Sequence, residues 1–426
     1  MEGQPRWMRL NNAAKIYPAA RRRSWNSLFR LSATLREPVD KEALQTALAA
    51  TVKRFPSMAV RIRRGMFWYY LEEIKTPPPV REEQAFPLVR MPFDDIRKCA
   101  FRVICYQNRI AVEFFHAVTD GNGGLVFLKT LVAEYLSVRY GLKIPNTDGV
   151  LSIDEPPREE ELEDSFLKND GPVSASRREA TAFKLRGTPE EDGYLNLITG
   201  ILETDQVLAL ARAHGVSLTA FLTAVMIACI LEMQNERVPN RRRQRPVKAL
   251  VPVNLRKMFP SDSLRNFVLY ITPGVDPRMG DYSFEEILKA VHHQMGMELN
   301  EKQMAARIAA NVRAERSLAL KIMPLFIKNL AMKLVFNLVG ERKSCITVSN
   351  LGAVGLPKEM AGYVTRMDFI LGAQATCPNN CGVISYQGKL YISFLRTIRE
   401  TELERRFFCY LRRLGLNVKL ESNRRG

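Results

Sequence analysis

A polar, acidic segment divides the chain and constrains its fold more than any other feature. Residues 146–193 are rich in Pro, Glu and Arg, and the stretch DEPPREEELED within them carries seven acidic residues against one arginine. Patterns typical of strands and of helices mix on both sides of it. Since 426 residues exceed the usual size of one hydrophobic core, we expect a domain at 1–145, a polar crossover linker at 146–193 and a second domain at 194–426.

Strand and helix patterns in the first half converge on a single turn. Two strand pairs are predicted, with turns at residues 64–65 and 107–108, and the second pair ends at His116. Helical periodicity begins after Gly121 and stops at Gly141. The sequence therefore predicts a strand, a tight turn and a helix in that order, within an α/β fold.

The longest uncharged run, Gly215–Leu231, is close to the length that crosses a bilayer. It contains Ser217, Thr219 and Thr223, and it follows a polar helix pattern. These features favour a buried helix in the core of the second half.

The turn contains one of only four histidines in the chain, within VEFFHAVTDGNGG. A histidine at a strand end can be held by the backbone on one side and act as a general base on the other. Asp120 and Gly121 permit a tight turn, and a buried Asp120 calls for an arginine partner. A purely structural histidine is the alternative interpretation.

The stretch FHAVTDG resembles the HxxxDG signature of the acyltransferase superfamily that includes chloramphenicol acetyltransferase, plant acyltransferases and nonribosomal peptide condensation domains. VPVNLRKMFP with LRNFVLYITPGV, and later TVSNLGAVGLP, resemble segments of its alcohol O-acetyltransferase branch. The likeness runs from about residue 11 to residue 420. It implies a two-domain chloramphenicol acetyltransferase-like α/β sandwich with a tunnel between the domains, entered by acyl-CoA from one face and by the acceptor from the other.

The resemblance also implies roles for single residues. His116 would be the catalytic base, and Arg256 would pair with Asp120 beside Gly121 as a structural motif. Many relatives carry a second histidine where this chain has Phe115, which weakens a likeness to the peptide-condensing branch. Candidates for substrate or oxyanion contacts are Asn266, Ser349 and Asn350, for which turn and strand-end hydrogen bonding is the alternative.

A net charge of +18 and a pI near 9.7 indicate an anionic partner. Nucleic acid is not expected, because the basic residues are dispersed and no nucleic-acid-binding pattern is present. A phosphorylated co-substrate such as CoA fits this positive charge. The candidate ligands of the CoA phosphates are Arg241, Arg242 and Arg243. The alternative interpretation of these three arginines is a solvated loop.

A membrane is a further anionic partner to consider, because residues 318–340 are largely apolar with lysines at 321, 328 and 333. The segment predicts either a buried helix broken at Pro324 or a basic helix lying on an anionic membrane. We expect the buried helix, and at most weak membrane association.

The expected function is that of a cytoplasmic, monomeric acyltransferase, with no signal peptide and with reduced thiols. It would move an acetyl or other acyl group from acyl-CoA, such as acetyl-CoA, to a small alcohol or amine. The alternatives are transfer from an acyl carrier protein and a non-catalytic relative that binds a lipid or a partner. No metal is expected, because the CPNNC pair has no second pair and His292 and His293 lack HExxH spacing.

Overall fold

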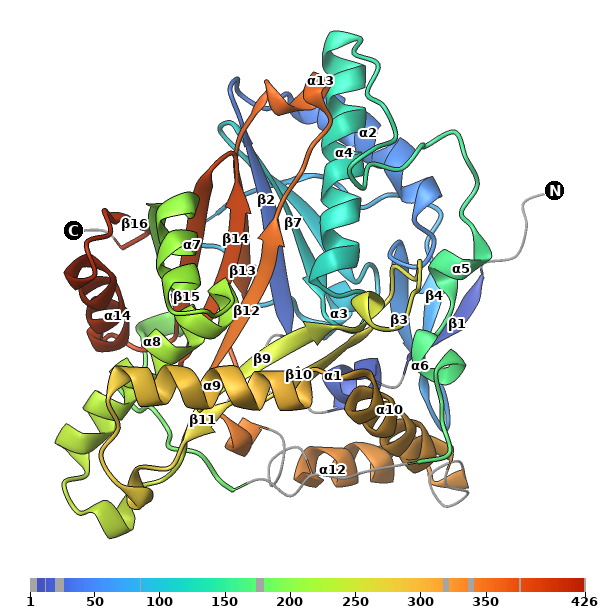
Figure 1. Ribbon diagram of the computed structural model, residues 1–426. Helices are drawn as coiled ribbons and strands as arrows, with labels where there is room; N and C mark the ends of the chain where they lie inside the picture. Colours follow the sequence, from blue (N-terminus) through green and yellow to red (C-terminus); the bar gives the residue numbers. More distant parts are fainter. Residues whose placement is uncertain are drawn as a thin grey trace.

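In the computed structural model, strands and helices are interspersed from the N-terminal to the C-terminal part of the described chain (Figure 1). In the part that it describes, the strands form sheets of five, eight and three strands. The predicted α/β class is therefore confirmed. The described residues are 6–11, 13–19, 27–84, 86–173, 180–316, 322–335, 341–374 and 377–424.

The five-stranded sheet carries the strand that ends before His116. Helices α2 (Lys41–Arg54) and α4 (Gly121–Tyr140) pack against it and share its hydrophobic core. Its strand order is β13-β2-β7-β6-β5. The bounds, in that order, are Val364–Leu371, Leu28–Leu35, Arg109–Phe115, Phe101–Tyr106 and Arg81–Glu82.

Several local predictions in this half are confirmed. Asp40 caps α2 by accepting hydrogen bonds from two backbone amides of its first turn. Gly141 ends α4 with a φ of 69°, a left-handed conformation that favours glycine. The second predicted strand pair is β6–β7, which turns at residues 107–108.

The eight-stranded sheet lies in the second half, in the order β10-β9-β12-β14-β15-β8-β16, with β11 (Gly274–Val275) beside β9. β12 and β14 run parallel, so a long connection separates them. The bounds in sheet order are Val268–Ile271, Val247–Asn254, Ile346–Ala353, Asn379–Tyr386, Lys389–Arg396, Asn196–Glu203 and Lys419–Ser422.

Helices cover one face of this sheet and form a second hydrophobic core. The central one, α8, is long and apolar enough to cross a membrane, but 78% of its most apolar window is buried. The buried helix predicted over Gly215–Leu231 is therefore confirmed. These helices are α7 (Thr204–Ala213), α8 (Leu218–Arg237), α9 (Phe284–Glu298) and α14 (Glu402–Arg413).

Strand β13 joins the two larger sheets. It comes from the second half of the chain, yet it pairs antiparallel with β2, with Phe369 opposite Leu31. Its backbone also lies against β14, because a Cβ on Gly382 would stand 2.4 Å from the Phe369 carbonyl oxygen. The two halves are thus in direct backbone contact, while the residue limits of two domains stay a prediction.

The acidic segment between the halves contains two short helices, α5 (Glu159–Leu162) and α6 (Ser165–Lys168). Glu161 is buried and accepts hydrogen bonds from the Arg54 guanidinium at 2.5 and 2.8 Å. Its backbone oxygen accepts from Leu264 N at 3.0 Å. The segment therefore anchors a loop of the second half against the first.

Helix α12 (Leu325–Val335) lies beside a small third sheet, where Asn329 Nδ2 donates to the Tyr69 hydroxyl at 3.0 Å. The predicted break at Pro324 is confirmed, because α12 begins directly after it. The predicted burial of this segment is wrong for part of the described helix: Phe326 is 64% exposed and Leu330 62% exposed. The reason is that α12 packs one side, which contains Leu325, onto α1 (Ile16–Ala19) and onto the tip of the hairpin between β3 (Val60–Arg64) and β4 (Tyr69–Glu73). Lys321 lies outside the described residues.

The remaining described strands and α-helices are short, apart from α10. They are β1 (Trp7–Arg9), which completes the third sheet, α1 (Ile16–Ala19), α3 (Phe93–Ile96), α10 (Glu301–Arg316) and α13 (Lys358–Ala361).

Candidate active site

His116 lies directly after β7, where the backbone turns toward α4. Its backbone N–H donates to Ser27 O at 2.8 Å, which fixes the strand end against the start of β2. The imidazole stacks on the Tyr17 ring with centroids 4.7 Å apart, and it meets Phe29 edge-on at 5.0 Å. Two aromatic rings from different elements therefore hold the ring in place.

The Asn266 side chain binds His116 at two points. Its amide nitrogen donates to the His116 carbonyl oxygen at 2.7 Å, so its amide oxygen is the end that faces His116 Nδ1 at 3.2 Å. An oxygen facing Nδ1 requires that Nδ1 carry the proton. His116 Nε2 then keeps its lone pair, which is the atom that a general base uses.

The surroundings favour a neutral imidazole. Burial lowers the pKa of His116, while its own backbone, the Asp120 charge and the Asn266 hydrogen bond oppose that shift in part. Burial raises the pKa of the Tyr17 hydroxyl, and the Asp120 charge raises it further. A neutral base thus stacks against a neutral phenol.

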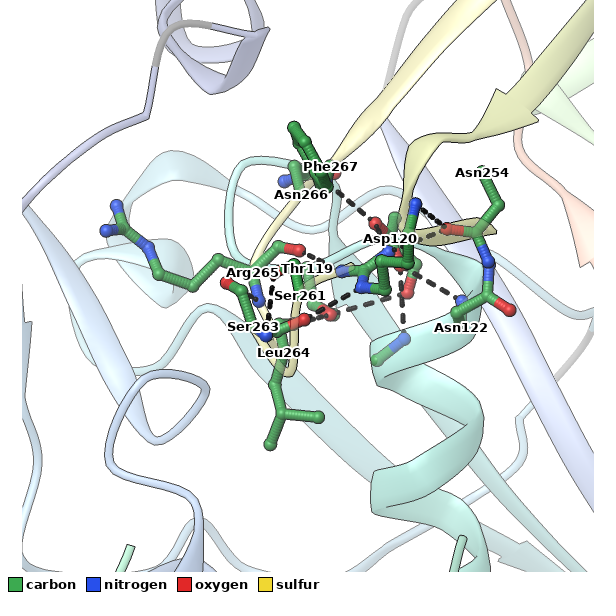
Figure 2. A network of polar contacts seen from close by, with 12 residues as sticks. Thr119, Asp120, Asn122, Asn254, Ser261, Ser263, Leu264, Arg265, Asn266 and Phe267 are labelled. Atoms are coloured by element: carbon green, nitrogen blue, oxygen red, sulfur yellow. Dashed lines mark hydrogen bonds and ion pairs between the residues drawn. The ribbon is translucent and has the colours of Figure 1, made fainter. Parts of the chain in front are cut away.

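Asp120 is the centre of a polar network, shown in Figure 2. Its Oδ1 accepts from the backbone amides of Asn122 and Gly123, both at 3.1 Å, and so caps α4. Its Oδ2 accepts from Arg256 Nη1 at 2.8 Å and from Phe267 N at 2.9 Å. The predicted pairing of Asp120 with Arg256 is therefore confirmed, and Asp120 is only 1% exposed.

The loop that carries Asn266 is docked directly onto the turn. Thr119 Oγ1 donates to Leu264 O at 2.6 Å, and a Cβ on Gly123 would stand 2.3 Å from that same oxygen. Gly123 therefore permits the approach of loop and helix. At Gly121 an added Cβ would meet the end of the Leu351 side chain at 2.7 Å.

The proximity of Leu351 to Gly121 brings the end of β12 to the same turn. Asn350 uses both ends of its amide: Nδ2 donates to Thr219 Oγ1 at 3.1 Å, and Oδ1 accepts from Gly352 N at 2.8 Å. These bonds favour the strand-end role that the sequence left open for Asn350. Ser349 lies in β12 and is 7% exposed, and it stays a predicted oxyanion donor.

The three arginines of the candidate CoA-phosphate cluster lie elsewhere. Residues 241–243 form an exposed turn after the C-terminal end of α8, and Arg241 pairs with Asp281. The opposite end of α8 contacts β12 through Thr219. A 20-residue helix such as α8 spans about 30 Å, so the cluster is far from the turn that carries His116.

Sequence reasoning missed four residues of the site. Thr119 and Gly123 lie inside the motif that the sequence analysis singled out, and the spacing could have pointed to them. Tyr17 and Asn11 come from the N-terminal segment, where Asn11 Nδ2 donates to Asn266 O at 2.7 Å. Within the described residues, no group of three potential metal ligands is present.

No family model and no curated protein matches the chain. Solved structures do resemble it over nearly their full length. Polyketide synthase associated protein 5 from Mycobacterium tuberculosis has a TM-score of 0.59 at 13% identity, covering 96% of this chain and 98% of its own.

Two further solved structures are similar to the same extent. Trichothecene 15-O-acetyltransferase from Fusarium sporotrichioides has a TM-score of 0.61 at 11% identity, covering 96% of this chain and 95% of its own. A mutant starter condensation domain of rhizomide synthetase, in complex with C8-CoA and Leu-SNAC, has a TM-score of 0.60 at 15% identity and covers 96% and 94%. This chain therefore has the two-lobed α/β fold that acetyltransferases and condensation domains share.

Proposed function

We propose that the protein is a CoA-dependent acyltransferase that moves an acetyl or other acyl group to an alcohol or amine. The observation that carries this proposal is the two-point contact of Asn266 with His116, which leaves the lone pair on Nε2. The fold supports it, since similar structures include an acetyltransferase and a domain bound to C8-CoA.

In the proposed reaction, donor and acceptor bind together beside His116. Nε2 accepts the proton of the acceptor hydroxyl or amine as the acceptor oxygen or nitrogen attacks the thioester carbonyl. The tetrahedral intermediate collapses with cleavage of the carbon–sulfur bond, and the departing thiolate takes the proton from Nε2. Ser349 is the candidate donor to the oxyanion, and the Asp120–Arg256 pair holds the turn.

A carrier-protein thioester is the second candidate donor, because condensation domains are among the similar structures. The same base would serve either donor. Phe115, which occupies the first histidine position of many relatives, is fully buried in the core of the first half. Its side chain therefore contributes packing. Because the lack of a histidine at this position weakens the likeness to the peptide-condensing branch, acyl-CoA is the donor that we propose.

The test is product analysis by mass spectrometry with acetyl-CoA and a pooled set of alcohols and amines. We expect an acetylated product, and His116→Ala should lower its rate of formation by roughly 10²- to 10⁴-fold. His292→Ala is the matched control, since His292 is exposed on α9. A well-folded His116→Ala variant with full activity would exclude His116 as the base. Product formed only from an acyl group on a pantetheine-bound carrier, and not from acetyl-CoA, would favour the second donor.

A further inference from the structure

Helix α12 buries a lysine on one side and exposes large apolar residues on the other. Lys328 is 1% exposed, and its Nζ lies 3.4 Å from the Trp68 ring centroid and donates to Phe67 O at 2.9 Å. Phe326 and Leu330, one turn apart on the opposite side, are more than half exposed. A surface helix normally turns such residues toward the core, so this exposed face lacks a partner within the described residues.

Neighbouring residues extend the exposed apolar surface. Met66, at the tip of the β3–β4 hairpin, is 75% exposed, and its backbone oxygen accepts from Leu325 N at 2.9 Å. Ile322 precedes α12 and is 67% exposed. We call the group made by Met66, Ile322, Phe326, Ile327 and Leu330 the α12 patch.

The two segments of the sequence that carry the α12 patch contain charged residues of one sign only. Residues 58–71 and 317–340 contain no Asp or Glu. Lys333 is exposed three residues after Leu330, and therefore on the same face of α12, and Arg64 is exposed beside the hairpin tip. A long lysine side chain at the rim of an apolar face can reach lipid headgroups while its stem stays in apolar surroundings.

We propose that the α12 patch is a docking surface for an anionic lipid membrane. The apolar residues would enter the boundary between headgroups and acyl chains, and Lys333 and Arg64 would contact anionic headgroups. A second copy of the chain is a poorer occupant, because a two-fold interface would place each basic rim opposite its own copy. The net charge of +18 acts in the same direction, toward an anionic surface.

The experiment is sedimentation of the full chain with phosphatidylcholine vesicles, with and without phosphatidylserine. We expect binding only to the anionic vesicles, with release at high salt. The double variant Phe326→Gln/Leu330→Gln should lower partitioning at least tenfold, and Lys333→Gln about fivefold. Met279→Gln is the matched control, because Met279 is 80% exposed outside the patch and should partition as the wild type does.

Three outcomes would overturn the proposal. One is no sedimentation of the wild type with anionic vesicles, and another is equal sedimentation of the wild type and the double variant. The third comes from light scattering: a wild-type dimer that the double variant turns into a monomer, without vesicle binding, would make the patch an interface between copies. Circular dichroism melting checks that the double variant is folded. Lys333→Gln leaves the apolar residues in place and tests the contact with anionic headgroups independently.

Discussion

The Asn266 side chain holds the His116 imidazole in one tautomer, because it makes hydrogen bonds both to His116 Nδ1 and to the His116 carbonyl oxygen. The two residues belong to different halves of the chain, 150 positions apart. The base is therefore complete only when the loop of the second half docks on the turn of the first. Asn266 acts through His116 and is a positioning residue.

The first prediction tests this role with a charge. In Asn266→Asp, a carboxylate next to Nδ1–H favours the imidazolium and raises the pKa of His116. Because the base is lost below that pKa, the acidic limb of the kcat/KM profile should move to higher pH. Asn266→Ala should lower kcat/KM by up to about 100-fold, because an imidazole that is no longer held in place is misaligned for proton transfer. An acidic limb that stays at the wild-type pH in Asn266→Asp would remove Asn266 from this role.

The second prediction concerns the pair that fixes the turn. Asp120→Asn or Arg256→Ala leaves a buried or nearly buried partner uncompensated, so the free energy of unfolding should fall by about 3 kcal/mol. Urea denaturation measures the change. Arg241→Ala is the control, since its pair with Asp281 is exposed and should contribute little. Equal midpoints for all four proteins would show that the Asp120 network does not stabilise the fold.

The third prediction compares two glycines of the same turn. An alanine at 123 would place its Cβ against the backbone oxygen of Leu264, which cannot move without undocking the loop. An alanine at 121 would meet only the flexible end of Leu351. We expect Gly123→Ala to lower the free energy of unfolding by about 1–3 kcal/mol, and Gly121→Ala by less. The reverse order in a denaturation experiment would contradict this geometry.

Local patterns predicted the turn well because the interactions that form it are local. Asp120 accepts from amides two and three residues ahead, so capping chemistry is visible in the sequence. The Asp120–Arg256 pair came from the family resemblance. The role of Asn266 could not be predicted, because its contact depends on how a loop of the second half docks. Burial of α12 was predicted wrongly for the side that carries Phe326 and Leu330, since composition does not determine which face of a helix finds a partner.

The fourth prediction concerns the donor. Acetyl-CoA carries phosphates, so its binding should weaken as salt rises if the positive charge of the protein attracts it. Replacing Arg241, Arg242 and Arg243 together by glutamine should leave the Kd unchanged, because the cluster lies beyond the far end of α8. Calorimetry measures both effects. A marked loss of affinity in the triple variant would show that these arginines do hold the phosphates.

The last prediction separates the ring of Tyr17 from its hydroxyl. Stacking of this ring is part of the enclosure that lowers the pKa of His116, so Tyr17→Ala should admit water and raise that pKa toward its ordinary value of about 6.5. A higher pKa means that the base is lost at a higher pH, and the acidic limb of kcat/KM should shift to higher pH.

Tyr17→Phe keeps the ring and removes a hydroxyl that stays neutral in the wild type, so its acidic limb should match that of the wild type. If the pH profiles of Tyr17→Ala and wild type coincide, the N-terminal segment does not control the pKa of the base. If the acidic limb of Tyr17→Phe shifts as far as that of Tyr17→Ala, the hydroxyl and not the ring stacking controls that pKa.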